Sequence, residues 1–265
     1  MSRIDSSARV EDGAVIGEGA VIGPFCTVGP HVTIGANTRL LSHVNVTGQT
    51  TIGENCTIYP FVSLGAAPQS TGHKGELTKL EIGHGCTIRE GTTMNAGTVA
   101  GGGITRVGDR GFFMNNAHIG HDCIVGNDVI FATSATLGGH VEVGDFTFIG
   151  GLSAVHQHVR IGSQVMIGGV SGVRGDIIPY GIVNGQRAKM EGLNVVGMKR
   201  RGFTASRFKT VWSFYNQLFL GDGIFADRLE VANTLRGTDP AIDDILDFIL
   251  EAKAKHHSLC MATVS

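Results

Sequence analysis

Residues 16–35 read IGEGAVIGPFCTVGPHVTIG, and this stretch decides the fold. Within it an aliphatic residue followed by glycine returns every six positions, at Ile16, Ile22, Val28 and Ile34. The same six-residue register covers residues 4–64 and 82–94 and, after a slip of one residue, 107–173. A period of six sustained this long is typical of a parallel β-helix built from hexapeptides. Three hexads close one triangular coil, so residues eighteen apart stack at a strand spacing of about 4.8 Å.

A second position repeats four residues after each large aliphatic residue, and most of the residues that occupy it are small. A narrow prism needs one large and one small inward side chain per face, because protein cores pack at crystal-like density. Four of the five cysteines occupy this small position: Cys26, Cys56, Cys86 and Cys123. We therefore interpret them as buried, space-filling thiols, and not as nucleophiles or a disulfide framework.

Composition narrows the class of protein. Of the 265 residues 42% are hydrophobic, so the forty glycines indicate corners of the coil and not disorder. The net charge of −2 gives no electrostatic case for nucleic-acid binding. No apolar run reaches the length of a membrane span, and residues 1–10 lack a signal-peptide core. We expect a cytoplasmic protein.

The hexads are interrupted twice and then give way to a helical pattern. We predict an all-β solenoid, a left-handed parallel β-helix of hexapeptide repeats, over residues 1–180, with loops near 66–79 and 99–106. A connector with a basic segment should cover 181–203, and a C-terminal α-helical domain 204–265. Thr204 is the expected N-cap of the first long helix, with further helices near 224–235 and 240–255. These helices would cap the open end of the solenoid.

Histidines gather on one outer face of the predicted solenoid. Steps of eighteen residues place Asp122, His140 and His158 in one column, with His121, Gly139 and Gln157 beside it. His156 falls in the next column. None of these is an inward position, so we expect several imidazoles within about two coil spacings, roughly 10 Å. Imidazole titrates near neutral pH, which suits it to accept a proton from a weakly acidic hydroxyl.

Several segments resemble one family of hexapeptide acyltransferases. They are Ile22–Cys26 (IGPFC), Asn116–Cys123 (NAHIGHDC), Ala154–Gln157 (AVHQ), Gly168–Gly172 (GGVSG) and Lys199–Phe203 (KRRGF). Together they are similar to the UDP-N-acetylglucosamine O-acyltransferases, which start lipid A biosynthesis in Gram-negative bacteria. The resemblance implies a homotrimer with active sites between neighbouring solenoids. It also implies a (R)-3-hydroxyacyl donor on acyl carrier protein and the 3-hydroxyl of UDP-N-acetylglucosamine as acceptor.

The resemblance also implies roles for residues. His121 would be the general base and Asp122 or a backbone carbonyl would fix its tautomer, while the Gly139 N–H is a candidate donor to the oxyanion. Substrate-binding positions would be His118, His140, His156, Gln157, Asn194, Arg200 and Arg201. Because the thiols point inward and no GxSxG motif occurs, we expect direct attack without an acyl-enzyme, and no cofactor.

One position is expected to set acyl length. In the family the residue matching Gly169 closes the far end of the acyl groove, so glycine here predicts a long, myristoyl-class donor. The first loop departs from the family: residues 70–76 read STGHKGE where relatives usually carry an Asp-Leu-Lys-Tyr-type sequence. Whether His73 or Lys74 takes over the contact with the sugar nucleotide stays open.

Three alternatives remain. The later N-acyltransferase of the same pathway carries a sizeable domain ahead of its solenoid, whereas the repeat here starts by Ile4. A non-catalytic solenoid scaffold would have no reason to cluster histidines. A zinc site of the γ-carbonic-anhydrase kind would need a wider histidine spacing than that of His118 and His121, so we expect no metal.

Overall fold

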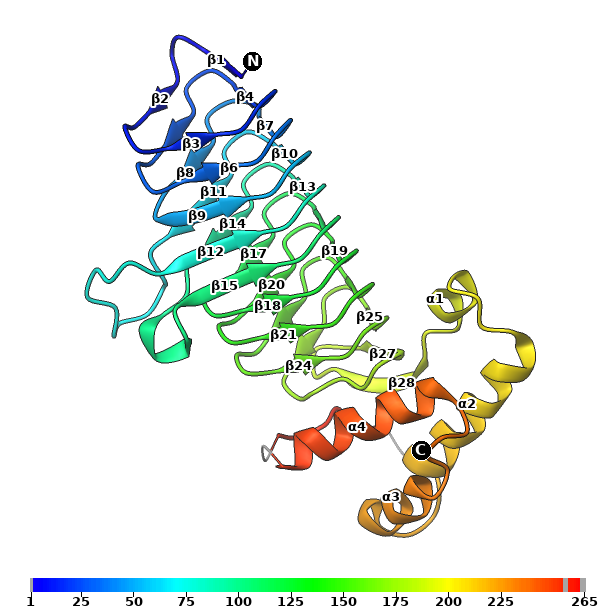
Figure 1. Cartoon of the computed structure of the whole chain (residues 1–265). Coiled ribbons are helices and arrows are strands. Elements are labelled where there is room, and N and C mark those ends of the chain that lie inside the picture. Colours follow the sequence, from blue (N-terminus) through cyan, green and yellow to red (C-terminus); the bar gives the residue numbers. More distant parts are fainter. Residues whose placement is uncertain (1, 255–256, 263–265) are drawn as a thin grey trace.

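The chain winds into a triangular parallel β-helix that ends in a helical region (Figure 1). The computed structural model describes residues 2–254 and 257–262. Every hexad contributes a short strand to one of three sheets, as the six-residue period predicts. The strands that come from hexads pair in parallel register within each sheet, for example Val21 with Arg39 and Ile22 with Leu40.

The strands of each sheet follow one another along the helix axis. Sheet A consists of β1 (Arg3–Ile4), β4 (Val21–Ile22), β7 (Arg39–Leu40), β10 (Thr57–Ile58), β13 (Thr87–Ile88), β16 (Phe112–Phe113), β19 (Ile130–Phe131), β22 (Phe148–Ile149), β25 (Met166–Ile167), β27 (Gly181–Asn184) and β28 (Lys189–Leu193). Sheet B consists of β2 (Arg9–Val10), β5 (Thr27–Val28), β8 (Asn45–Val46), β11 (Ser63–Ala66), β14 (Thr93–Asn95), β17 (His118–Ile119), β20 (Thr136–Leu137), β23 (Ala154–Val155) and β26 (Gly172–Val173). Sheet C consists of β3 (Val15–Ile16), β6 (Thr33–Ile34), β9 (Gln49–Ile52), β12 (Lys79–Ile82), β15 (Ile104–Val107), β18 (Ile124–Val125), β21 (Glu142–Val143) and β24 (Arg160–Ile161).

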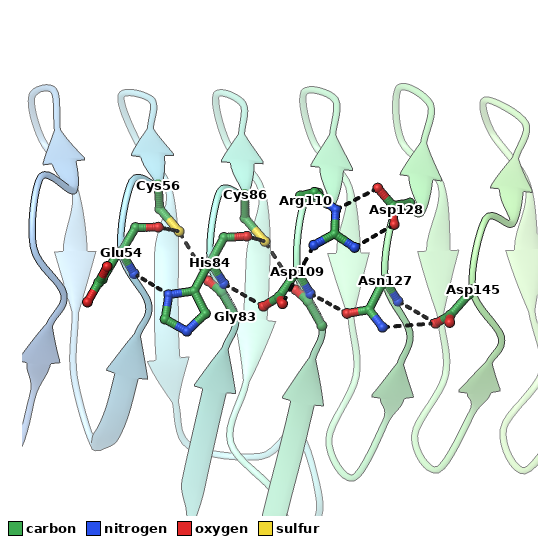
Figure 2. Close-up of polar contacts among 11 residues, drawn as sticks. Glu54, Cys56, Gly83, His84, Cys86, Asp109, Arg110, Asn127, Asp128 and Asp145 are labelled. Carbon is green, nitrogen blue, oxygen red and sulfur yellow. Dashed lines mark hydrogen bonds and ion pairs between the residues drawn. The ribbon is translucent and has the colours of Figure 1, made fainter.

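The small inward residues do more than fill space. The thiols of Cys56 and Cys86 donate to the carbonyls of Gly83 and Gly108, each at 3.2 Å. Figure 2 shows the two thiols and their contacts. The Thr38 hydroxyl makes the equivalent bond at 2.7 Å, to the carbonyl of Gly53. All five cysteines are free and buried, which confirms the interpretation of the four inward thiols. Burial raises the pKa of Cys123 to about 12, which suppresses the reactive thiolate.

The corner between sheets C and A carries a ladder of side chains that accept backbone N–H groups from the preceding coil (Figure 2). His84 Nδ1 accepts from Glu54 N at 3.0 Å, and Asp109 accepts from His84 N at 2.7 Å. Asn127 accepts from Asp109 N at 2.8 Å, and Asp145 from Asn127 N at 2.7 Å. These bonds satisfy peptide groups that the sheets leave without a partner.

Both interruptions are loops that lengthen a coil. Ile82 pairs with Ile52 and then with Val107, so these coils span 30 and 25 residues instead of 18. The first loop covers residues 67–78, close to the prediction. The second covers 96–103 and contains the short 3₁₀ helix η1 (Val99–Gly101). Its predicted range of 99–106 started and ended too late, because residues 104–106 belong to β15 and pair with β12.

The last coils extend further than the hexads indicate. Strand β27 adds to β25 in parallel, and β28 returns antiparallel to β27 within the predicted connector. Then follow α1 (Val195–Arg200), α2 (Ala205–Phe219), α3 (Phe225–Asn233) and α4 (Pro240–Ala254). Thr204 caps α2 as predicted, because its side chain accepts from Arg207 N. Among the described helices none is both long and apolar enough to cross a membrane.

A buried arginine joins the helical region to the solenoid. The Arg160 side chain on β24 is 6% exposed, and its Nη2 donates to Glu251 of α4 at 2.6 Å. Its guanidinium also lies 3.7 Å from Asp176 and 4.4 Å from the centre of the Phe248 ring. The Asp176 carboxylate in turn contacts His257 at 3.2 Å. The cation is thus shared between the last coil and α4.

We expect Arg160→Ala to lower the free energy of unfolding by about 3 kcal/mol, because it leaves the buried Asp176 carboxylate without its arginine. Arg106→Ala is the matched control, since Arg106 lies in the same column of sheet C. Its pair with Glu81 is exposed, and such pairs contribute only about 0–1 kcal/mol. Urea unfolding followed by fluorescence of Trp212 on α2 measures both variants at equal protein concentration. Equal losses would show that Arg160 does not hold the helical region.

Candidate active site

The corner between sheets B and C brings together the histidine column that the eighteen-residue step predicts. The rings of His140 and His158 stack with centroids 4.4 Å apart, and His121 meets His140 edge-on at 5.1 Å. Asp122, His140 and His158 all have positive φ, near 60°. This left-handed turn geometry recurs at each coil and points successive side chains along one ridge.

His121 and Asp122 form an imidazole–carboxylate pair. His121 Nδ1 lies 2.8 Å from Asp122 Oδ2, and His140 Nε2 lies 3.6 Å from the same oxygen. An ionised carboxylate only accepts hydrogen bonds, so Nδ1 carries the proton and Nε2 keeps its lone pair. Within the described residues Nε2 has no hydrogen-bond partner. The arrangement can therefore accept a proton at Nε2 and stabilise the resulting imidazolium.

The Asp122 side chain is not on the solvent-facing surface where the sequence places it. It is only 1% exposed, whereas His121 is 17% exposed. The reason is the second loop, which folds over this corner: Thr98 donates to Asp122 Oδ1 through its N–H and to Oδ2 through its hydroxyl, each at 2.7 Å. On the other side, Asp122 N donates to Thr105 Oγ1 at 2.8 Å.

Gly139 lies directly against His121. A Cβ at this position would come within 2.5 Å of His121 Cε1 and 2.8 Å of Nε2, so any side chain would displace the ring. The Gly139 N–H donates no hydrogen bond within the described part of the chain. It is therefore available to an oxygen that approaches beside Nε2.

His118 is on the neighbouring face, on β17 of sheet B. Its Nδ1 lies 2.8 Å from Thr93 Oγ1, which fixes the plane of the ring. Burial, followed by the neighbouring His121, lowers the pKa of His118. Burial also lowers the pKa of His140, against the opposing effect of Asp122. Both rings are thus held toward the neutral form.

His156 and Gly169 lie on either side of sheet B, toward the C-terminal end of the solenoid. His156 directly follows β23, and its Nδ1 lies 3.1 Å from the carbonyl of Gln157. Gly169 follows β25 in the corner between sheets A and B and is exposed. A Cβ there would meet only Gly151, with its oxygen at 3.3 Å. Sheet B therefore separates Gly169 from the histidine column.

The basic segment lies on a different corner. A groove of about 570 Å³ lies over sheet A at its corner with sheet C. It is lined by Asn194, Arg200 and Arg201 together with Asp128, Ile130, Phe146, Thr147, Phe148, Met166, Ile182, Val196 and Gly197. Asn194 caps α1, and Arg201 stacks 4.3 Å from the centre of the Phe146 ring. Within one chain, therefore, Asn194, Arg200 and Arg201 lie on a different corner from His121.

The divergent first loop is partly tied to itself. His73 Nδ1 lies 3.1 Å from Glu76 Oε2, and the His73 side chain is only 15% exposed. The same carboxylate oxygen accepts from Lys74 N at 2.8 Å. His73 is therefore engaged within the loop, while Lys74 is exposed.

His121, Asp122 and His140 could in principle hold a metal ion, since one ligand atom of each lies within 4.8 Å of the others. Both Asp122 oxygens, however, already accept hydrogen bonds from Thr98 or contact His121. None of these three residues has a buried side-chain nitrogen or oxygen that lacks a hydrogen-bond partner. The absence of a metal stays a prediction.

Sequence reasoning missed Thr93, Thr98 and Thr105. Thr93 pairs in register with His118, but across the second loop the step is 25 residues, so counting by eighteen does not find it. The strand register that resumes after the loop is the sequence signal that would have aligned Thr93 with His118.

Comparisons with known proteins identify this hexapeptide-repeat chain as a transferase. A family model described as bacterial transferase hexapeptide matches residues 31–66, and the second domain of UDP-N-acetylglucosamine O-acyltransferase matches 176–259. The acyl-[acyl-carrier-protein]–UDP-N-acetylglucosamine O-acyltransferase of Azorhizobium caulinodans is 54% identical over 80% of this chain and 78% of its own. That of Caulobacter vibrioides is 46% identical over 81% of each chain.

Solved structures give the same result. The UDP-N-acetylglucosamine acyltransferase from Campylobacter jejuni superposes with a TM-score of 0.90 at 35% identity, over 99% of this chain and 100% of its own. The O-acyltransferase from Moraxella catarrhalis gives 0.90 at 38% identity, over 94% and 96%. The predicted left-handed parallel β-helix is confirmed. The chain belongs to the UDP-N-acetylglucosamine O-acyltransferase family.

Proposed function

We propose that this O-acyltransferase moves a (R)-3-hydroxyacyl chain from acyl carrier protein to the 3-hydroxyl of UDP-N-acetylglucosamine, the first step of lipid A biosynthesis. The names of the relatives support both substrates. The single observation that carries the chemistry is His121, with Nδ1 on a buried carboxylate and Nε2 without a partner.

In the proposed mechanism, His121 Nε2 takes the proton of the 3-hydroxyl as its oxygen attacks the thioester carbonyl. Asp122 stabilises the imidazolium, and the Gly139 N–H donates to the oxyanion of the tetrahedral intermediate. Collapse of the intermediate breaks the carbon–sulfur bond, and the imidazolium returns its proton to the thiolate. Buried thiols support direct transfer without an acyl-enzyme. No cofactor takes part, and the cytoplasmic location remains a prediction.

The site is proposed to be completed by a second copy in a homotrimer. His121 is in the corner between sheets B and C, whereas Asn194, Arg200 and Arg201 line the corner between C and A. Arginines bind phosphates through paired donors, which suits the diphosphate of the sugar nucleotide or the acidic carrier protein. In a three-fold ring, one corner of each chain can face the other corner of its neighbour.

The transfer itself is tested with purified protein, 3-hydroxymyristoyl carrier protein and UDP-N-acetylglucosamine. Chromatography of a radiolabelled sugar nucleotide detects the acylated product. Absence of product with both substrates present would contradict the proposed function.

Subunit mixing tests the shared site. We expect His121→Ala and the double variant Arg200→Ala/Arg201→Ala to be poorly active alone, but to regain activity when coexpressed as mixed trimers. Random assembly restores about one quarter of the sites, because each needs one intact histidine corner and one intact arginine corner. Each variant coexpressed with itself is the control. Mixed trimers no more active than the variants alone would place the whole site within one chain.

A further inference from the structure

The second loop forms hydrogen bonds to the catalytic corner through Thr98. Its N–H donates to Asp122 Oδ1 and its hydroxyl to Oδ2, each at 2.7 Å. Both oxygens of one carboxylate are therefore held by one loop residue. Oδ2 is also the oxygen that contacts His121 Nδ1, at 2.8 Å.

The direction of the Thr98 hydroxyl is determined by the loop. Thr98 Oγ1 accepts from Gly101 N at 3.0 Å and so caps η1. With a donor on one side, the hydroxyl proton is directed to the carboxylate on the other. Rotation of the Asp122 carboxylate would break this bond and the bond from Thr98 N together.

An independent feature shows how closely the loop covers Asp122. A Cβ at Gly101 would lie 2.2 Å from Asp122 Cγ and within 2.5 Å of both oxygens. Only glycine permits η1 to lie on the carboxylate at this distance. The contact accounts for the 1% exposure of the Asp122 side chain. The Asp122 carboxylate is thereby shielded from water.

We propose that Thr98 is a positioning residue of the transfer reaction, which acts by orienting the Asp122 carboxylate toward His121. The inference rests on the proposed function of the His121–Asp122 pair. Thr98 binds no substrate in this account. Its loss should therefore lower kcat and leave KM for UDP-N-acetylglucosamine nearly unchanged.

The first test compares three single variants. Thr98→Val removes the hydroxyl at constant shape and should lower kcat about 10- to 100-fold, as expected for a small misplacement of a catalytic group. Thr98→Ser keeps the hydroxyl and should retain most of the wild-type kcat. Thr87→Val on sheet A is the matched control and should match wild type. A Thr98→Val enzyme with unchanged kcat, or a Thr98→Ser enzyme as slow as Thr98→Val, would overturn the proposal.

A double-mutant cycle shows whether Thr98 acts through Asp122. Added to Asp122→Asn, Thr98→Val should cause little further loss. A full additional loss in that background would overturn the positioning role. Wild-type activity of Asp122→Asn alone would instead contradict the proposed pair. Should Thr98→Val fail to fold, Thr98→Ala takes its place in the cycle, since it also removes the hydroxyl that donates to Asp122.

Discussion

His121→Ala is expected to lower kcat by about 10²–10⁴, which is the usual contribution of a general base. A sugar hydroxyl is too weakly acidic to attack a thioester unaided, and His121 Nε2 has no partner among the described residues. Both Asp122 oxygens accept hydrogen bonds from Thr98, so we do not expect this carboxylate to replace the imidazole as the base. Substrate binding should change little, because the ring acts on a proton during transfer.

The measurement is steady-state transfer by variants whose melting temperature matches wild type. His43→Ala is the control, since His43 lies between Phe25 and Phe61 on the corner between sheets A and B. His118→Ala, His140→Ala and His156→Ala should show smaller losses, as expected of groups that position substrates. Near wild-type turnover by His121→Ala would show that His121 is not the general base.

The second large effect concerns acyl length. Wild type is expected to prefer a myristoyl-class 3-hydroxyacyl donor, and Gly169→Met to prefer a decanoyl-class donor. Gly169 is exposed, and among the described residues a Cβ there would meet only Gly151. We therefore expect the position to leave room for a long acyl chain. Each buried methylene contributes about 0.8 kcal/mol, so four more favour the longer chain by about two orders of magnitude. A methionine would occupy that length and exclude the longer chain by overlap.

Competition between carrier proteins loaded with the two chains measures this preference in both enzymes. Gly169→Ala is the control, because one methyl group shortens the groove little and should leave the long chain preferred. Wild type that favours the short chain would contradict the prediction. So would Gly169→Met with an unchanged preference.

Uninterrupted coils could be predicted residue by residue. In these coils each residue pairs with the residue eighteen positions away. Counting in steps of eighteen therefore predicts correctly that His140 stacks on His158 and that Cys56 is buried. The N-cap at Thr204 was also local, because a capping side chain acts on a peptide group three residues away. In these cases the physical cause lies within a few residues or within one fixed repeat.

The loops could not be predicted in this way. The second loop changes the coil length to 25 residues, and its path depends on hydrogen bonds to Asp122 that no periodicity specifies. The contact of Arg160 with α4 likewise joins residues 91 positions apart. The path of the second loop and the position of α4 both depend on packing between elements that are distant in sequence.

The sequence by itself determined the triangular coil, its inward residues and the ridge of histidines, because one strand register repeats along the axis. Only the tertiary structure decided that Asp122 is buried under Thr98 and that the arginines lie on another corner from His121. The reason is that a repeat specifies neighbours along one column. It does not specify how an inserted loop or a terminal helix packs across columns.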